Sequence, residues 1–247
     1  MSSSLSIRGL MELFERRNAL EQFYEEIANL EIAQRGKRTL SECSGHMDWP
    51  RRGVYFFFED GEFREDGVTP RLTRVGTHAL RPSKSTLWGR LSQHKGPVGG
   101  SMPGGGNHRG SIFRLHVGTA MLNTGEWPVP IQANWGRGST ADAAIRQVEH
   151  PLEVEVSRYI GNLPFLWLAV DDEPSLRSDR GLIENGAISL LSNRDRHAID
   201  PPSTSWLGHM ADRAAVRESG LWNVNHVDDL PTRKFLDSFS NYIKRLM

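Results

Sequence analysis

The fold is decided by two runs of sequence, Gly53-Val54-Tyr55-Phe56-Phe57-Phe58 and Leu72-Thr73-Arg74-Val75-Gly76. Both are rich in the aromatic and β-branched residues that favour strands. A polar stretch that begins at Glu59-Asp60-Gly61 and reaches Pro70 separates them. Two strand-like runs with a polar, glycine-containing connection predict a β-hairpin with a long loop.

A helix is expected soon after this hairpin. Either Ser83 or Ser85 can cap its start, the apolar positions run from Leu87 to Leu91, and Gly96-Pro97 ends it. Arg90 and His94 are four residues apart on this helix. Because residues at that spacing lie on the same helical face, we expect the two side chains to point in one direction.

Further elements flank this centre on both sides. Apolar residues at helical spacing over 10–30 predict an amphipathic N-terminal helix that ends near residue 35. Alternating apolar and basic residues over 112–117 predict a third strand. Beyond it we expect a helix over 141–160 with Pro151 as a candidate break, a buried strand over 164–170, a helix over 177–191 and a last helix over 235–246.

The order hairpin, helix, strand, helix resembles the GIY-YIG nuclease superfamily. Gly53-Val54-Tyr55 is similar to the first motif and Arg74-Val75-Gly76 to the second, with Arg74 in the place of a tyrosine. Arg90 resembles the family's helix arginine, and some restriction-type members place a histidine where His94 stands. Glu184 and Asn193 resemble the glutamate of a later helix and the asparagine that follows it. The literal Tyr159-Ile160-Gly161 is interpreted as a helix end.

The resemblance covers about residues 49–193 and implies an α/β fold. We expect a small central antiparallel sheet flanked by helices, with helical additions at both ends and a long insertion. The expected division is a helical N-terminal extension over 1–45, a GIY-YIG-like nuclease domain over 46–200 with an insertion at about 96–162, and a C-terminal extension over 201–247.

The resemblance implies a metal-dependent endonuclease that hydrolyses DNA phosphodiester bonds to 5′-phosphate and 3′-hydroxyl ends. Glu184 would hold Mg²⁺ (or Mn²⁺), Arg90 would bind the scissile phosphate, and Tyr55 with His94 would handle water and protons. Such hydrolysis needs an aligned water, a base and a cation near the developing charge. Arginine stays protonated and cannot be a base. The altered motif therefore leaves that task to Tyr55 or to a histidine, His94 or His78.

The distribution of charge favours a nucleic-acid partner, although 30 Lys and Arg balance 30 Asp and Glu. No Asp or Glu occurs from Gly67 to Gly125, whereas eight Lys and Arg residues do. A one-sided segment of this kind can attract phosphate. The glycine-rich loop over 99–110 lacks the Gly-Lys-Ser/Thr of a P-loop. The expected nucleic-acid contacts are Arg74, His78, Lys84, Asn107, His108, Arg109 and Asn193.

Other functions stay open on the sequence alone. The same basic surface would serve a non-catalytic nucleic-acid-binding module, and the scaffold would also suit a small-molecule enzyme. A second metal site at Asn223-Val224-Asn225-His226, with His197 and His209, lacks the strand–strand–helix context of a ββα-metal nuclease. Trp206 and Trp222 are interpreted as core residues rather than base-stacking platforms.

Composition bounds the setting of the protein. Cys43 is the lone cysteine, which excludes an internal disulfide and a cysteine-rich zinc site. The longest wholly apolar run covers 164–170, far short of the roughly 20 residues of a membrane helix. We therefore expect a cytoplasmic protein without a membrane partner. Because one such domain carries one active site, a double-strand cut implies two copies, and the N-terminal helix is the candidate surface for a homodimer.

Overall fold

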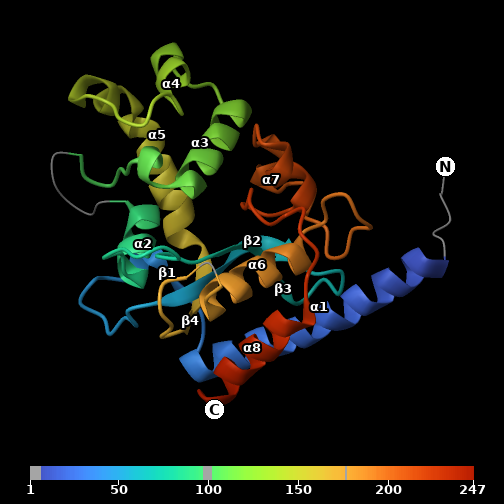
Figure 1. Cartoon of the computed structure of the whole chain (residues 1–247). Coiled ribbons are helices and arrows are strands. Elements are labelled where there is room, and N and C mark those ends of the chain that lie inside the picture. Colours follow the sequence, from blue (N-terminus) through green and yellow to red (C-terminus); the bar gives the residue numbers. More distant parts are fainter. Residues whose placement is uncertain (1–6, 97–101, 176) are drawn as a thin grey trace.

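The computed structural model describes residues 7–96, 102–175 and 177–247. Its centre is a four-stranded sheet in the order β1-β4-β2-β3, antiparallel at every pairing. The strands are β1 (Arg38–Thr39), β2 (Gly53–Phe63), β3 (Pro70–Gly76) and β4 (Pro164–Ala169). The expected mixed α/β fold with a small antiparallel sheet is therefore confirmed (Figure 1).

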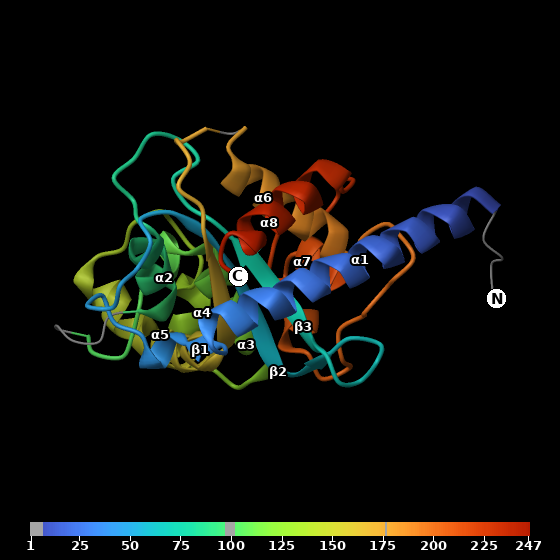
Figure 2. The same cartoon turned by 90° about the horizontal axis from the view of Figure 1, so that it is seen from below.

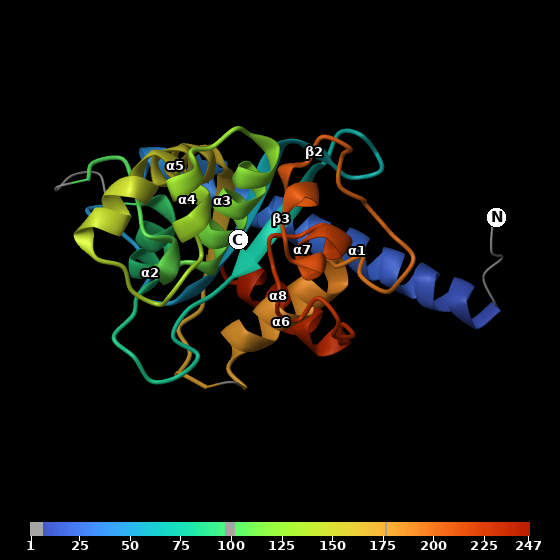
Figure 3. The same cartoon turned by 90° about the horizontal axis from the view of Figure 1, so that it is seen from above.

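Helices cover both faces of this sheet. One layer contains α1 (Ile7–Gln34), α6 (Asp179–Leu191) and α8 (Arg233–Lys244), seen from below in Figure 2. The other contains α2 (Leu87–Lys95), α3 (Ile112–Thr124), α4 (Val129–Asn134), α5 (Ala143–Asn162) and α7 (Ala214–Ser219), seen from above in Figure 3. No helix in the described ranges is long and apolar enough to cross a membrane.

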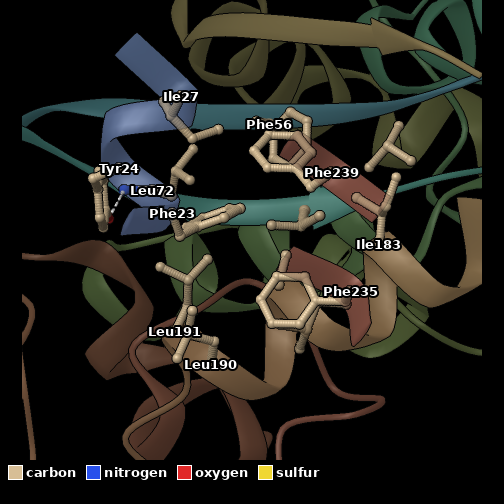
Figure 4. Close-up of a cluster of buried hydrophobic side chains, with 14 of the residues drawn as sticks. Phe23, Tyr24, Ile27, Phe56, Leu72, Ile183, Leu190, Leu191, Phe235 and Phe239 are labelled. Carbon is tan, nitrogen blue, oxygen red and sulfur yellow. Dashed lines mark hydrogen bonds between the residues drawn. The ribbon is translucent and has the colours of Figure 1, made fainter. Parts of the chain in front are cut away.

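The alternation of side chains along β2 divides the core in two. Val54, Phe56 and Phe58 point to the layer of α1, α6 and α8, where they meet Phe23 and Phe239 (Figure 4). Tyr55 and Phe57 point to the opposite layer. Successive side chains of a strand face opposite sides of its sheet, so a strand buried on both faces reads as a continuous apolar run. This explains why 53–58 contains no polar residue besides the Tyr55 hydroxyl.

The two motif glycines are required by close packing. A Cβ atom at Gly76 would lie 2.3 Å from the Tyr55 hydroxyl, because the ring of Tyr55 crosses Gly76 on the neighbouring strand. A Cβ atom at Gly53 would lie 2.4 Å from the Leu168 carbonyl oxygen on β4. The glycine of the second motif thus makes room for the tyrosine of the first.

The strand predicted over 112–117 is wrong, because these residues open helix α3. Ser111 caps the helix by accepting a hydrogen bond from the Arg114 backbone N–H. The alternation does not mark an exposed and a buried face, because Arg114 and His116 are buried whereas Ile112 is exposed and Leu115 is half-buried. The Arg114 guanidinium is neutralised inside the core by Glu153 of α5.

The other predicted elements are confirmed with small changes in their ends. The hairpin, the N-terminal helix, the strand over 164–170 and the helices over 177–191 and 235–246 all form. Thr86, rather than Ser83 or Ser85, caps α2 by accepting from the Gly89 N–H at 3.0 Å. Helix α5 runs through Pro151 without interruption and includes 159–161 up to Asn162.

Substituting alanine for Gly76 tests the close approach of the hairpin. We expect Gly76→Ala to displace the Tyr55 ring and lower the free energy of unfolding by about 1–3 kcal/mol, as overpacking does. Gly110→Ala is the matched control, because nothing lies within 4 Å of a Cβ atom there. Urea unfolding of the two variants measures the difference, and equal stabilities would contradict the packing argument.

Candidate active site

The sequence-predicted catalytic residues meet where β3 ends beside α2 and α6. The backbone N–H of Thr77, directly after β3, donates to Glu184 Oε1 of α6 at 3.0 Å. The Tyr55 hydroxyl lies 2.9 Å from His94 Nε2 of α2. Burial lowers the pKa of His94 and raises that of Glu184, and the positive charge of Arg90, also on α2, acts on both groups toward a lower pKa. The four residues expected to be catalytic therefore lie near one another.

Tyr55 and His94 begin a buried chain of hydrogen bonds. His94 Nδ1 lies 2.7 Å from the Ser111 hydroxyl, on the side opposite to Tyr55. Burial, followed by the charges of Arg90, Arg74 and Arg114, holds the pKa of His94 well below its ordinary value of 6.5. His94 is consequently neutral at pH 7, with one ring nitrogen available as an acceptor.

Arg90 has guanidinium atoms left over for a ligand. Its NH1 donates to Gln93 Oε1 at 3.0 Å and to the Gly110 carbonyl oxygen at 3.2 Å. Its Nε and NH2 have no partner among the residues that the structure describes. The side chain is partly exposed, unlike most arginines of this region. A guanidinium held by its neighbours yet open on one edge suits a phosphate oxygen.

Glu184 has the features of a lone metal-binding carboxylate. Its Oε1 is oriented by the Thr77 N–H, and its Oε2 has no hydrogen-bond partner within the described part of the chain. Burial raises the pKa of Glu184, although the Thr77 N–H and the charges of His226, Arg74 and Arg90 act against the rise. A cation would stabilise this carboxylate, and Mg²⁺ is commonly bound by one or two carboxylates with waters and substrate phosphates. No cluster of three or more His, Cys, Asp or Glu side chains occurs among the described residues, so Glu184 would act with substrate oxygens.

Arg180 fastens the loop after β3 to the helix that carries Glu184. It is fully buried, pairs through Nε with Asp172, and donates from NH1 to the His78 carbonyl oxygen at 2.5 Å. Its backbone N–H donates to the same Asp172 carboxylate at 3.0 Å. Because Arg180 lies one turn before Glu184 on α6, it holds the Thr77–Ala79 loop against the glutamate helix.

Arg74 is buried in the sheet rather than exposed to a ligand. Its side chain lies over the Phe113 ring, 4.6 Å from the centroid, and NH1 donates to the Trp222 carbonyl oxygen at 2.6 Å. Only 5% of the residue is exposed. Burial lowers the pKa of Arg74, and the nearby Tyr55 acts in the opposite direction. Direct contact between Arg74 and nucleic acid is not available in this arrangement.

Two residues of the glycine-rich segment are likewise held inside the protein. His108 is 2% exposed, stacks on Trp135 at 3.9 Å, and has both ring nitrogens bonded, Nδ1 to Glu153 and Nε2 to the Gly136 N–H. Arg109 forms an ion pair with Glu149 at 2.6 Å. Asn107 is exposed and accepts from the Arg109 N–H through its side chain. Residues 97–101 of the loop lie outside the described residues.

The remaining residues expected to contact nucleic acid also include both exposed and buried side chains. Lys84 is exposed on the connection between β3 and α2. His78, in the same connection, is buried, and burial together with the charge of Arg180 lowers its pKa to about 4. Asn193 lies past the end of α6, where its Oδ1 accepts from Arg16 at 3.1 Å and from the Ile199 N–H at 3.0 Å. Among these three, only Lys84 has a side chain open to a large ligand.

The acid-free segment is less basic in the fold than in the sequence. Arg71, Arg109 and Arg114 each pair with a carboxylate from outside the segment. Glu62 neutralises Arg71 from the adjacent strand, and Glu149 and Glu153 of α5 neutralise the other two. Sequence windows cannot show ion pairs between distant segments, so the field left for phosphate comes from exposed groups such as Arg81 and Lys84 together with Arg90.

The C-terminal segment supplies parts of the site that sequence reasoning missed. The Trp222 N–H donates to the Thr73 carbonyl oxygen at 2.7 Å, and the Asn223 side chain both accepts from the Val75 N–H and donates to its carbonyl oxygen. His226 follows with φ +64° and pairs with Asp229 at 2.8 Å. Burial raises the pKa of Glu184, and among the charged side chains that oppose this rise His226 has the largest effect. The cluster Asn223-Val224-Asn225-His226 was the available signal, but in the sequence it was considered only as a second metal site and set aside.

Comparison with known proteins agrees with this geometry. A family model described as "GIY-YIG domain" matches residues 14–247. The chain therefore belongs to the GIY-YIG domain family, which places it in a nuclease class. Neither the curated proteins nor the solved structures contain a significant match.

Replacing Arg180 tests the anchor of the loop. Arg180→Met leaves the Asp172 carboxylate and the His78 carbonyl without their partner, so we expect a loss of about 3–5 kcal/mol in the free energy of unfolding, as for a broken buried pair. Arg177→Met is the control, since Arg177 is exposed in the same segment. Chemical denaturation provides the measurement, and a loss as small as in the control would show that the anchor is dispensable.

Glu184→Gln should make the protein more stable near neutral pH. Because the pKa of Glu184 is raised in the folded state, its protonated form is favoured there. Its contribution to stability is full below the ordinary value of 4.5 and is lost as pH rises through the folded pKa. We expect the two proteins to melt alike at about pH 4 and the variant to melt higher at about pH 7. A melting difference that does not change with pH would contradict the assignment.

Proposed function

We propose that the protein is a metal-dependent endonuclease that hydrolyses DNA phosphodiester bonds. One observation carries the proposal above all others. The Tyr55 hydroxyl is held at 2.9 Å from His94 Nε2, and Arg90 and the backbone-oriented Glu184 lie near this pair. A hydroxyl that can orient water, a phosphate-binding cation and a metal-binding carboxylate are groups that serve phosphodiester hydrolysis.

Glu184 would hold the divalent cation through its Oε2, with substrate oxygens and water completing the coordination. When bound, Mg²⁺ or Mn²⁺ supplies a positive charge beside the phosphate oxygens. The protein's own contribution is the orientation of the carboxylate, since the Thr77 N–H fixes Oε1 and Arg180 fixes the loop that carries Thr77.

The hydrogen-bond chain orients the Tyr55 hydroxyl. In the tautomer with a proton on Nδ1, His94 donates to the Ser111 hydroxyl and its Nε2 accepts from Tyr55. The low pKa of His94 keeps Nε2 unprotonated at neutral pH, so this hydrogen bond persists there. Because a histidine with so low a pKa is a weak base, the role proposed for Tyr55 is to orient the attacking water and not to pass its proton to His94.

Arg90 would bind the scissile phosphate through its open guanidinium edge. Charge that develops on the phosphate oxygens in the transition state is stabilised there, and the loss of one such donor typically lowers a rate by 10²–10³. Arg81 and Lys84 on the connection that leads into α2, and Asn107, are exposed and would contact the flanking backbone. The proposed nucleic-acid interface leaves out Arg74, His78, His108, Arg109 and Asn193, whose side chains have partners inside the protein or are buried.

Plasmid cleavage tests the proposal directly. We expect the purified protein with Mg²⁺ or Mn²⁺ to nick supercoiled plasmid, and we expect Glu184→Gln to bind the DNA but to cleave it at least about 10²-fold more slowly. Glu155→Gln on α5 is the control, because that carboxylate pairs with Arg158 on the surface. Chelation of the metal should abolish cleavage by the unaltered protein.

The outcomes separate this enzyme from the two alternatives. If Glu184→Gln cleaved the plasmid as fast as the unaltered protein, the assignment of Glu184 as the metal-binding carboxylate would be wrong. Salt-dependent DNA binding without any cleavage would favour a non-catalytic binding module, and absence of salt-dependent binding would favour a small-molecule enzyme.

A further inference from the structure

We infer that His226 is a second protein ligand, through its Nε2 atom, of the divalent cation that Glu184 would hold. A site with one oxygen and one nitrogen ligand from the protein favours a transition metal such as Mn²⁺ or Co²⁺ over Mg²⁺. The inference deepens the proposed function and rests on the role given there to Glu184. Binding of the metal alone can be measured without DNA, so the ligand and the nuclease can be refuted separately.

Two anchors fix the place of His226 in the fold. Before it, the Asn223 side chain accepts from the Val75 N–H and donates to the Val75 carbonyl oxygen, one residue before the end of β3. After it, Val227 is buried in the core cluster to which α6 contributes, and its carbonyl oxygen accepts from the Ser192 hydroxyl at 2.7 Å. The segment therefore brings residue 226 to the place where the end of β3 meets α6.

The imidazole of His226 lies near the Glu184 carboxylate, which α6 carries. Among the charged side chains that act toward a lower pKa of Glu184, His226 has a larger effect than Arg74 or Arg90. The effect of a charge falls with distance, so this order indicates proximity. Glu184 is half-buried, and its Oε2 has no hydrogen-bond partner in the described ranges. A carboxylate oxygen without a protein partner thus lies beside the imidazole.

His226 is oriented as metal-binding histidines commonly are. Its Nδ1–H donates to Asp229 Oδ2 at 2.8 Å. Such a bond from one ring nitrogen to a carboxylate fixes the tautomer and leaves the other nitrogen for the metal. Nε2 has no partner among the described residues, and 37% of the side chain is exposed. The backbone of His226 has φ +64°, a conformation that few residues other than glycine adopt and that often occurs at functional sites.

The types of ligand determine which cation the site prefers. Mg²⁺ is bound almost entirely by oxygen atoms, whereas imidazole nitrogen suits the transition metals. No cluster of three or more His, Cys, Asp or Glu occurs in the described part of the chain, so water and phosphate oxygens would fill the remaining positions. The carboxylate of Asp229 offsets part of the positive charge with which Arg74 and Arg90 oppose a cation at Glu184.

Calorimetric titration of the full-length protein with Co²⁺, Mn²⁺ or Mg²⁺, in the absence of DNA, tests the inference. We expect Co²⁺ to bind most tightly and Glu184→Gln to weaken the binding of all three cations. His226→Gly should weaken Co²⁺ binding by about 10-fold or more and change Mg²⁺ binding less. Glycine is chosen because it adopts a positive φ without strain. His46→Gln is the control, since His46 is exposed on the segment before β2.

Two further measurements separate ligation from a role in holding the turn. Zn²⁺ is diamagnetic, so we expect it to shift the ring resonances of His226 in nuclear magnetic resonance spectra of the unaltered protein, and not in those of Glu184→Gln. Asp229→Asn keeps the imidazole and removes its carboxylate partner. We expect this variant to bind Co²⁺ about 10-fold or more weakly, as for other partners of metal-binding histidines.

Either of two results would overturn the inference. One is an unchanged Co²⁺ affinity in His226→Gly that melts as a folded protein, and the other is an absence of any Zn²⁺-dependent shift at His226. If His226→Gly does not fold, Asp229→Asn decides, and an unchanged Co²⁺ affinity there refutes the ligand. Metal binding through His226 without DNA cleavage would retain the ligand and refute the nuclease. Cleavage that is lost in Glu184→Gln, with a metal affinity that His226→Gly leaves unchanged, would do the reverse.

Discussion

The passage of the Tyr55 ring across Gly76 is the contact on which the site depends. The hydroxyl occupies the space in which any other residue at position 76 would place its Cβ atom. The ring thereby reaches the end of the hairpin, where its hydroxyl bonds His94 of α2 and His94 in turn bonds Ser111, the cap of α3. Strand pairing and the geometry of the candidate site are thus one constraint, because a one-residue shift of register would turn Tyr55 to the other face of the sheet.

The polar groups around this contact come from helix α2, from the sheet and from helix α6. Helix α2 supplies a neutral histidine and an open arginine, the sheet supplies the phenol and a buried guanidinium, and α6 supplies a carboxylate that the strand backbone orients. The Asp172–Arg180 ion pair joins the segment that follows β4 to helix α6. The histidine has a lowered pKa and the glutamate a raised one, mainly through burial. Opposed shifts of this kind are typical of functional sites.

The sequence predicts best those parts of the fold that depend on residues close to one another in the chain. The hairpin and most helices are specified by local patterns, and the motif order was sufficient to select Tyr55, Arg90, His94 and Glu184. The failures have a common cause. Arg114 was assigned to a strand with basic residues on one face because its partner Glu153, 39 residues away, is not visible locally. Arg109 was assigned to nucleic acid because its partner Glu149 is 40 residues away. An ion pair between residues far apart in the sequence buries charged side chains, whereas the local sequence pattern predicts that these side chains are exposed.

The bonds from Trp222 and Asn223 to β3 also have a consequence for aggregation. These two residues cover the edge of the hairpin, and the Trp222 carbonyl oxygen accepts from the Arg74 guanidinium, across 148 residues of chain. Whenever this segment is detached, β3 is an uncovered edge strand of the kind that pairs with other chains. One distant segment therefore both protects the sheet edge from self-association and gives the buried Arg74 its hydrogen-bond partner.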